Sequence, residues 1–170
     1  MAEQGTWLLP NLVVGPGDVS RLHRELEALD EYLRQASLRG GEDKADEVRL
    51  PKLSRSLDEL AGLNKLDLLD EGQRDQAKQF LQALLKHAPV VHVSFAADPS
   101  SAFMDKIITW FRQNVHPRLL VRVGLQPTIA AGCVLRTPNH YYDFSLRQHF
   151  VHQKSLLLQK LESLENHVGQ

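Results

Sequence analysis

Three histidines near the end of the chain are the residues best suited to metal chemistry. His149 and His152 are three residues apart, so a helix here would place both imidazoles on one face, with His140 shortly before them. A zinc site needs a third ligand and usually a fourth. The single cysteine, Cys133, falls in a predicted strand, and no carboxylate stands at a suitable spacing beside the pair. We therefore interpret these histidines as exposed helix residues and predict no metal and no other cofactor.

Asp143, Ser145 and His149 carry the three groups of a hydrolytic triad, and Ser145 and His149 are one helical turn apart. The Gly-x-Ser-x-Gly pattern of an exposed nucleophile does not surround Ser145, which is suited instead to cap the helix that follows it. Cys133 is a second candidate nucleophile, but a buried strand residue is the simpler interpretation. No Gly-rich phosphate loop follows a predicted strand. The sequence thus predicts no catalytic residues and no enzyme activity in this chain.

Basic and aromatic residues of the second half are suited to RNA. The set comprises Lys106, Arg112, Arg118, Arg122, Arg136, Arg147, Tyr141 and Tyr142. Arg118 and Arg122 share strand parity, so one face of a sheet would be positive. Single-stranded RNA prefers aromatic residues in the centre of a sheet, whereas both tyrosines are predicted at a turn. An RNA-binding module is therefore an alternative, and nucleic acid is not the expected partner.

The charge of the chain is divided unevenly along its length. The total is −1, but residues 1–88 hold 12 Lys and Arg against 16 Asp and Glu, whereas residues 89–170 hold 8 against 5. The near-neutral total argues against general binding to nucleic acid or to an anionic membrane, and the basic half favours an acidic partner. One cysteine fits a reducing compartment, and no apolar run reaches the roughly 20 residues of a membrane helix. We expect a cytoplasmic protein.

The first half of the chain is predicted to be helical. An extended arm over 1–16 precedes a helix from 18 to about 38, and two shorter helices follow near 51–63 and 71–86. The glycine-paired, charged stretch 40–47 is predicted as a loop. The first helix has apolar positions in a four-three spacing at Leu22, Leu26, Leu29, Leu33 and Ala36. This spacing is typical of a coiled-coil seam, and it also fits a helix lying on its own domain.

The second half combines short β-branched runs with two helices. The expected elements are a strand at 90–95, a helix at 99–115 capped by Asp98, strands at 118–124 and 129–137, a short segment at 140–144 and a last helix over 145–166. The fold class is therefore α/β in the broad α+β sense. Residues 1–88 form an arm and about three helices, and residues 89–170 form a small domain with the order strand-helix-strand-strand-helix.

Residues 119–147 follow a recognisable order of apolar, small and capping residues. The positions are Leu119 and Val121, then Leu125, Gln126 and Ile129, then Ala131-Gly132, Leu135 and Arg136, and finally Asp143 and Ser145. This order resembles the C-terminal part of the delta subunit of bacterial F-type ATP synthases, whose mitochondrial counterpart is the oligomycin-sensitivity-conferring protein. The resemblance covers about residues 89–165. The chain departs from the family pattern at Cys133 and Pro138, and it has three helical segments where the family has a six-helix bundle.

The resemblance implies a structural subunit of the stator, the part of the enzyme that does not rotate. Its partners would be the peripheral-stalk b subunits and the alpha subunits of the catalytic head, and it would meet the inner face of the cell membrane only through the complex. Stator joints depend on apolar burial and shape, with a helix docking in a groove as the expected mode. The candidate contacts are Leu125, Ile129, Ala131, Gly132, Val134 and Phe144, together with Leu22, Leu26, Leu29 and Leu33. A helical and α/β adaptor with an unrelated partner is the alternative.

Overall fold

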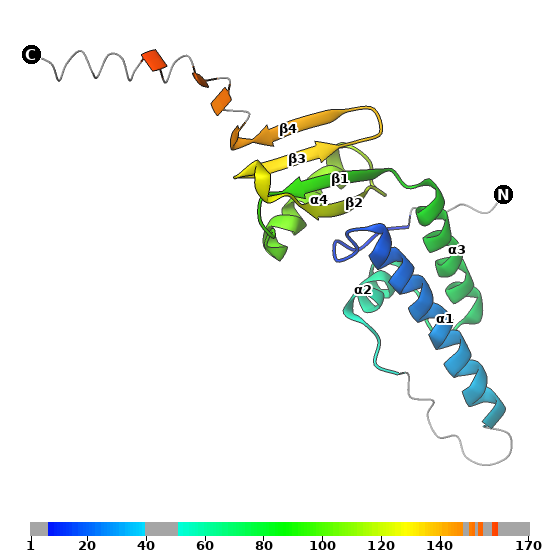
Figure 1. Ribbon diagram of the computed structural model, residues 1–170. Coiled ribbons are helices and arrows are strands. Elements are labelled where there is room, and N and C mark those ends of the chain that lie inside the picture. The colour runs from blue at the N-terminus through cyan, green and yellow to red at the C-terminus, as the bar shows by residue number, and fades with distance from the viewer. Residues whose placement is uncertain (1–6, 40–50, 148–149, 152, 155–157, 160–170) are drawn as a thin grey trace, which may run out of the picture. The chain divides into compact units, whose positions relative to one another are not determined.

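The computed structural model describes residues 7–39, 51–147, 150–151, 153–154 and 158–159 of the 170-residue chain. The fold is α+β, with a helical N-terminal part and a strand-rich C-terminal region (Figure 1). The chain divides into two compact units, 1–90 with 102–121 and 91–101 with 122–170. The first unit thus includes a segment from beyond the expected boundary after residue 88. Within the described residues, no helix is both long and apolar enough to cross a bilayer.

Three helices in the first part of the chain match the expected pattern closely. They are α1 (Pro16–Arg39), α2 (Arg55–Asn64) and α3 (Glu71–His87). The Ser54 hydroxyl caps α2 by accepting from the Leu57 N–H, and Asp70 caps α3 by accepting from the Gly72 N–H. Each cap satisfies a backbone donor that has no partner inside its helix, which explains why both helices begin where they do.

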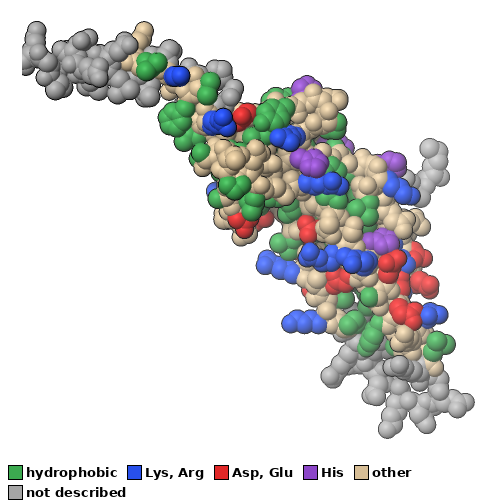
Figure 2. Space-filling model, in the orientation of Figure 1, with side chains coloured by type: hydrophobic (Ala, Val, Ile, Leu, Met, Phe, Trp, Pro, Cys, Tyr) green, Lys and Arg blue, Asp and Glu red, His purple; other side chains and the backbone are tan. Residues whose placement is uncertain are grey.

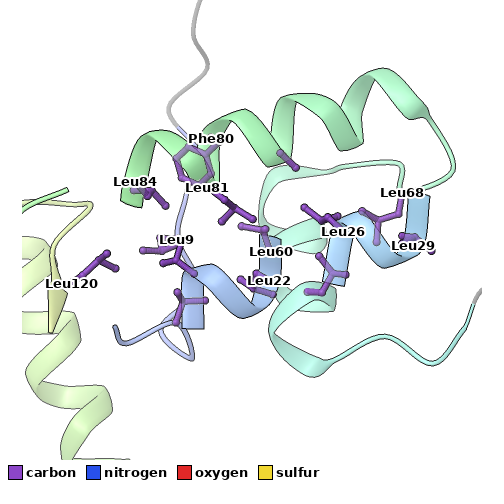
Figure 3. Packing of buried hydrophobic residues seen from close by; sticks show 14 residues of the cluster. Leu9, Leu22, Leu26, Leu29, Leu60, Leu68, Phe80, Leu81, Leu84 and Leu120 are labelled. Carbon is purple, nitrogen blue, oxygen red and sulfur yellow. The ribbon is translucent and has the colours of Figure 1, made fainter. Parts of the chain in front are cut away.

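The core of the first unit is built mainly from leucines of the three helices (Figure 3). α1 and α3 lie side by side, and the side chains of Leu22, Leu26 and Leu81 point into the space that the helices enclose. Trp7 of the arm stacks on Phe80 with ring centroids 5.1 Å apart. The described part of the arm is therefore part of this core. The helical spacing of residues 71–86 predicts Leu85 on the buried face of α3, but Leu85 is exposed.

A half-buried arginine holds the arm in place. Arg112 lies on α4 (Ser101–Asn114), and its guanidinium donates to the carbonyl oxygens of Leu9, Pro10 and Val13, the Pro10 bond being 2.8 Å long. Burial lowers the pKa of Arg112 to about 10, so the side chain is still charged at neutral pH. The side-chain amide of Asn11 donates a hydrogen bond to the Thr109 hydroxyl oxygen at 3.0 Å. One cation thus satisfies several arm carbonyls that lie away from regular structure.

Replacing Arg112 with methionine should therefore loosen the arm. We expect the free energy of unfolding to fall by about 2–4 kcal/mol, because charged hydrogen bonds are lost and the Leu9 and Val13 carbonyls lose the donor that Arg112 supplies. Urea denaturation followed by circular dichroism measures the change. Arg24→Met is the matched control, since Arg24 is exposed and makes one 3.4 Å bond to the Ser20 carbonyl. Equal unfolding midpoints for the two variants would contradict this role of Arg112.

A half-buried ion cluster joins α1 to α3. The carboxylate of Asp30 on α1 accepts from the Arg74 guanidinium and the Lys78 ammonium on α3. The Arg74 side chain is only 6% exposed, and it also donates to the carbonyl oxygens of Leu68 and Leu69 at 2.9 Å. Desolvation would raise the pKa of Asp30, but the hydrogen bonds and charges of Lys78 and Arg74 together lower it. On the visible face, acidic and basic side chains are interspersed over α1 and α3 (Figure 2).

Four strands form one mixed sheet in the order β2-β1-β3-β4, with β4 at an outer edge (Figure 1). The strands are β1 (Val90–Phe95), β2 (Leu120–Leu125), β3 (Gly132–Arg136) and β4 (Tyr141–Ser145). β3 runs antiparallel to both β1 and β4. The three strands after α4 begin one to three residues later than the sequence predicted. Residues 146–147, 150–151, 153–154 and 158–159 are helical, and the rest of the expected last helix lies outside the described residues.

The sequence predicts that the strands join at Gln126-Pro127, and the structure shows a tight link there. A short 3-10 helix, η1 (Pro127–Ile129), leads into Ala130, whose φ of 64° lies in the left-handed region. The Ala131 N–H donates to the Ile129 carbonyl at 2.9 Å, which closes a γ-turn around Ala130. Gly132 follows with a φ of +94°. Two residues with positive φ, Ala130 and Gly132, therefore lead the chain into β3.

Two expectations about α4 are wrong. Asp98 does not cap this helix, because the regular turns begin only at Ser101. The apolar spacing of residues 99–115 predicts Phe103 and Trp110 in the core, but both are exposed, whereas Met104, Ile108 and Phe111 are buried. The face of α4 that is buried is narrower than the apolar face that the sequence predicts.

Candidate partner-binding surface

The six candidate contacts from residues 125–144 separate into exposed and buried sets. Leu125 and Phe144 are 60% and 63% exposed. Ile129 and Val134 are buried and support the unit from within. Ala131 and Gly132 form the expected small-residue step and are exposed. Ala131 directly precedes β3, and Gly132 is its first residue.

The backbone of β4 lies against Gly132 and leaves no space for a side chain there. A Cβ at this position would collide with the Phe144 carbonyl oxygen and lie 3.1 Å from the Ser145 Cα. The sequence predicted a close approach of backbone or of a neighbouring helix at the Ala131-Gly132 step. The structure shows that at Gly132 the approaching element is the paired strand itself, and that Gly132 also needs its freedom at positive φ.

A row of aromatic rings lies on β4. The rings of Tyr142 and Phe144 are nearly parallel, with centroids 6.2 Å apart and an angle of 14°, and His140 extends the row at 5.9 Å from Tyr142. Tyr142 is 45% exposed. Alternation along a strand places Tyr142 and Phe144 on the same face of the sheet. We call Tyr142 and Phe144 the aromatic row.

The aromatic row continues a face that is buried at its other end. Register pairs Phe144 with Cys133 and Tyr142 with Leu135, and these pair in turn with Phe95 and Val93 of β1. Val93 and Phe95 are buried, whereas Cys133 and Leu135 are half-buried. Exposure therefore rises steadily from β1 to β4 on one apolar face. Contiguous exposed apolar surface of this kind marks sites of protein association.

Exposed aromatic side chains also follow one side of α4. Phe103 and Trp110 are seven residues apart, so they lie on one helical face, and Ile107 between them is half-buried. Trp110 is 57% exposed and contacts Phe111 edge-on. The sequence identified these residues but placed them in the core. Their spacing alone could not separate a buried face from an exposed one.

The leucine seam of the first helix contributes to its own unit. Leu22, Leu26 and Leu29 are buried in the core of the helical part, and Leu33 packs against that core from a half-buried position. Of the two interpretations of the four-three spacing, the structure shows the packing of a helix on its own domain. A partner helix could reach these leucines only by displacing α2 or α3.

The two candidate nucleophiles, Ser145 and Cys133, are placed unfavourably for chemistry. Asp143 accepts from the Ser145 N–H at 2.8 Å and Ser145 is buried, while His149 and His152 lie outside the described residues. Burial and the charge of Asp143 raise the pKa of the Cys133 thiol, which keeps it protonated and poorly nucleophilic. The described ranges contain no cluster of three histidine, cysteine or carboxylate side chains placed to hold a metal ion.

Comparison with known proteins finds no protein-family model that matches the sequence and no curated protein that matches it.

Proposed function

We propose that this chain is a non-catalytic stator subunit of a rotary F-type ATP synthase. Its C-terminal α/β part binds the helices of the stalk b subunits, and its helical part meets the alpha subunits of the catalytic head or extends the stalk. The complex holds the chain at the inner face of the membrane. In this role the chain resists rotation and supports proton-driven ATP synthesis without reacting itself.

The observation that best supports this proposal is the exposed apolar face that ends in the aromatic row. A joint under load needs surface whose burial is favourable, at about 25 cal/mol per Å² of apolar area removed from water. Tyr142 and Phe144 offer such surface on a rigid hairpin, and they lie within the segment that resembles the delta family. Rigid aromatic side chains are also the residues that most often dominate interface energies.

The double substitution Tyr142→Ser with Phe144→Ser tests the proposal. We expect the variant to lose about 3 kcal/mol or more of binding free energy, roughly a hundredfold in affinity, because two central aromatic contacts are removed. The measurement is affinity purification of the full-length tagged chain from its native host, followed by mass spectrometry of ATP synthase subunits. Wild-type protein should retain the b subunits, and the variant should not.

Leu63→Ser is the matched control, since Leu63 is a similarly exposed apolar residue on α2, outside the proposed surface. It should retain the b subunits at the wild-type level. Circular dichroism of all three proteins shows whether the fold is kept. Absence of ATP synthase subunits from the wild-type sample, or their equal recovery with the double variant, would refute this assignment of the surface.

A second candidate, single-stranded RNA binding, is favoured by one feature of β4. The tyrosines that were expected at a turn lie within a strand, and Arg136 stacks over the Tyr141 ring at 5.2 Å. Aromatic rings and arginine on strands are the means by which many proteins stack nucleobases. Anisotropy of a labelled polyuridine would test it: this function requires binding that weakens steeply with salt, and the stator function requires none.

A further inference from the structure

The hairpin of β3 and β4 has a defined pattern of backbone hydrogen bonds. The Thr137 N–H donates to the His140 carbonyl and the Leu146 N–H donates to the Ala131 carbonyl, both at 2.9 Å. These bonds lie at the two ends of the β3–β4 ladder. In an antiparallel pair, hydrogen-bonded positions recur at every second residue. The two bonds therefore fix which residues of β4 face β3 and which face away from it.

Tyr142 and Phe144 are the positions of β4 whose N–H and C=O groups point toward β3. Tyr141, Asp143 and Ser145 consequently direct theirs to the outer edge of the sheet. β4 is the last strand in the sheet order, so within the described residues no further strand pairs with these groups. An edge of this kind is a template for pairing with another chain.

One residue occupies part of this edge from within. The Asp143 carboxylate accepts from the outward N–H of Ser145 at 2.8 Å, so that donor is no longer available to an incoming strand. Hydrogen bonds from the Ser145 hydroxyl and N–H lower the pKa of Asp143, which keeps the carboxylate charged at neutral pH. An added strand would bring its own carbonyl oxygens against this negative charge and would have to break the bond to Ser145.

We propose that Asp143 closes the outer edge of β4 to strand addition by a second copy of this chain. The exposed aromatic row on the same strand makes such protection necessary, because an apolar strand with an open edge is prone to associate edge to edge. Charge at an edge strand is one of the ways by which natural sheets prevent this. The hairpin then accepts only partners that pack on a face. The proposal does not depend on the stator function.

The test is Asp143→Val in the full-length protein, studied by sedimentation velocity over a range of concentrations at neutral pH. Valine favours strand structure and cannot accept from the Ser145 N–H. We expect wild-type protein to remain monomeric and the variant to form a dimer. The dissociation constant of that dimer should be at least about tenfold lower than that for self-association of wild type. Amide hydrogen exchange should slow at Tyr141 and at residue 143 in that dimer, because edge pairing protects the outward N–H groups.

Asp98→Val is the matched control, since it removes an exposed carboxylate from the same unit without touching β4. It should remain monomeric. Asp143→Asn, which removes only the charge, provides a second reading if the valine variant does not fold, and it should also associate more strongly than wild type. The proposal is overturned if the Asp143 variants stay monomeric, or if they associate while the outward amides of β4 exchange at the wild-type rate.

Discussion

Gly132→Ala should cost the C-terminal unit most of its stability. The added methyl group collides with the Phe144 carbonyl on the paired strand, and alanine disfavours the φ of +94° that Gly132 adopts. Strain at positive φ and a clash with backbone that cannot move aside together predict a loss of about 3 kcal/mol or more in the free energy of unfolding. Thermal unfolding, followed by near-ultraviolet circular dichroism of the tyrosines, measures the effect.

Gly62→Ala is a strict comparison for this prediction. Gly62 lies inside α2, a Cβ there meets nothing within 4 Å, and its φ is ordinary. The same substitution should therefore stabilise the helical part by up to about 1 kcal/mol, through helix propensity and a less flexible unfolded chain. Opposite signs for the two variants are the expected result. A Gly132→Ala protein as stable as wild type would show that the Phe144 carbonyl of β4 does not lie against Gly132 as described.

Asp30→Asn should destabilise the helical part nearly as much. The substitution keeps the shape of the side chain but leaves the Arg74 guanidinium, whose side chain is 6% exposed, without its anion. Breaking a buried ion pair by removing one partner costs about 3–5 kcal/mol. Glu31→Gln is the matched control, because Glu31 pairs with Arg34 at the surface of the same helix, where solvent screens the pair, and its loss should leave the stability nearly unchanged.

The same cluster predicts a dependence of stability on pH. The pKa of Asp30 is lower in the folded chain than its usual value of 3.8, so the folded state favours the deprotonated carboxylate more than the unfolded state does. Its contribution is therefore fully present above about pH 4 and is lost as the pH falls through the folded pKa. The urea concentration at the unfolding midpoint is measured from pH 6 downward. For wild type it should decrease once the pH is below 4, and for Asp30→Asn it should decrease less steeply. Parallel curves for the two proteins would remove Asp30 from the account.

Local sequence rules predicted the helical part well. The four-three spacing of α1 depends on residues a few positions apart, and the structure places each helix within about four residues of its expected bounds, whereas the cap at Ser54 was not predicted. The pairing of Asp30 with Arg74 could not be predicted, because these residues are 44 positions apart. Each also lies among polar residues of its helix, where a charged side chain is expected to face solvent. Only the packing of α1 against α3 brings them together.

The surface residues were harder to predict than the fold. Trp110 and Phe103 satisfy a helical period as well as buried residues do, so hydrophobicity alone assigned them to the core. Tyr142 was placed at a turn because Pro138-Asn139 precedes it, but the two-residue turn ends early enough for β4 to begin at Tyr141. Exposure depends on which elements cover a face, and that information is spread over the whole chain.

The most direct test of the central proposal is the coupling of ATP hydrolysis to proton transport. Inverted membrane vesicles from cells that lack this chain should hydrolyse ATP without forming a proton gradient, as followed by quenching of an acridine dye. Purified wild-type protein should restore the gradient, and the Tyr142→Ser, Phe144→Ser variant should not. Vesicles that pump protons at the wild-type rate without this chain would contradict a stator role.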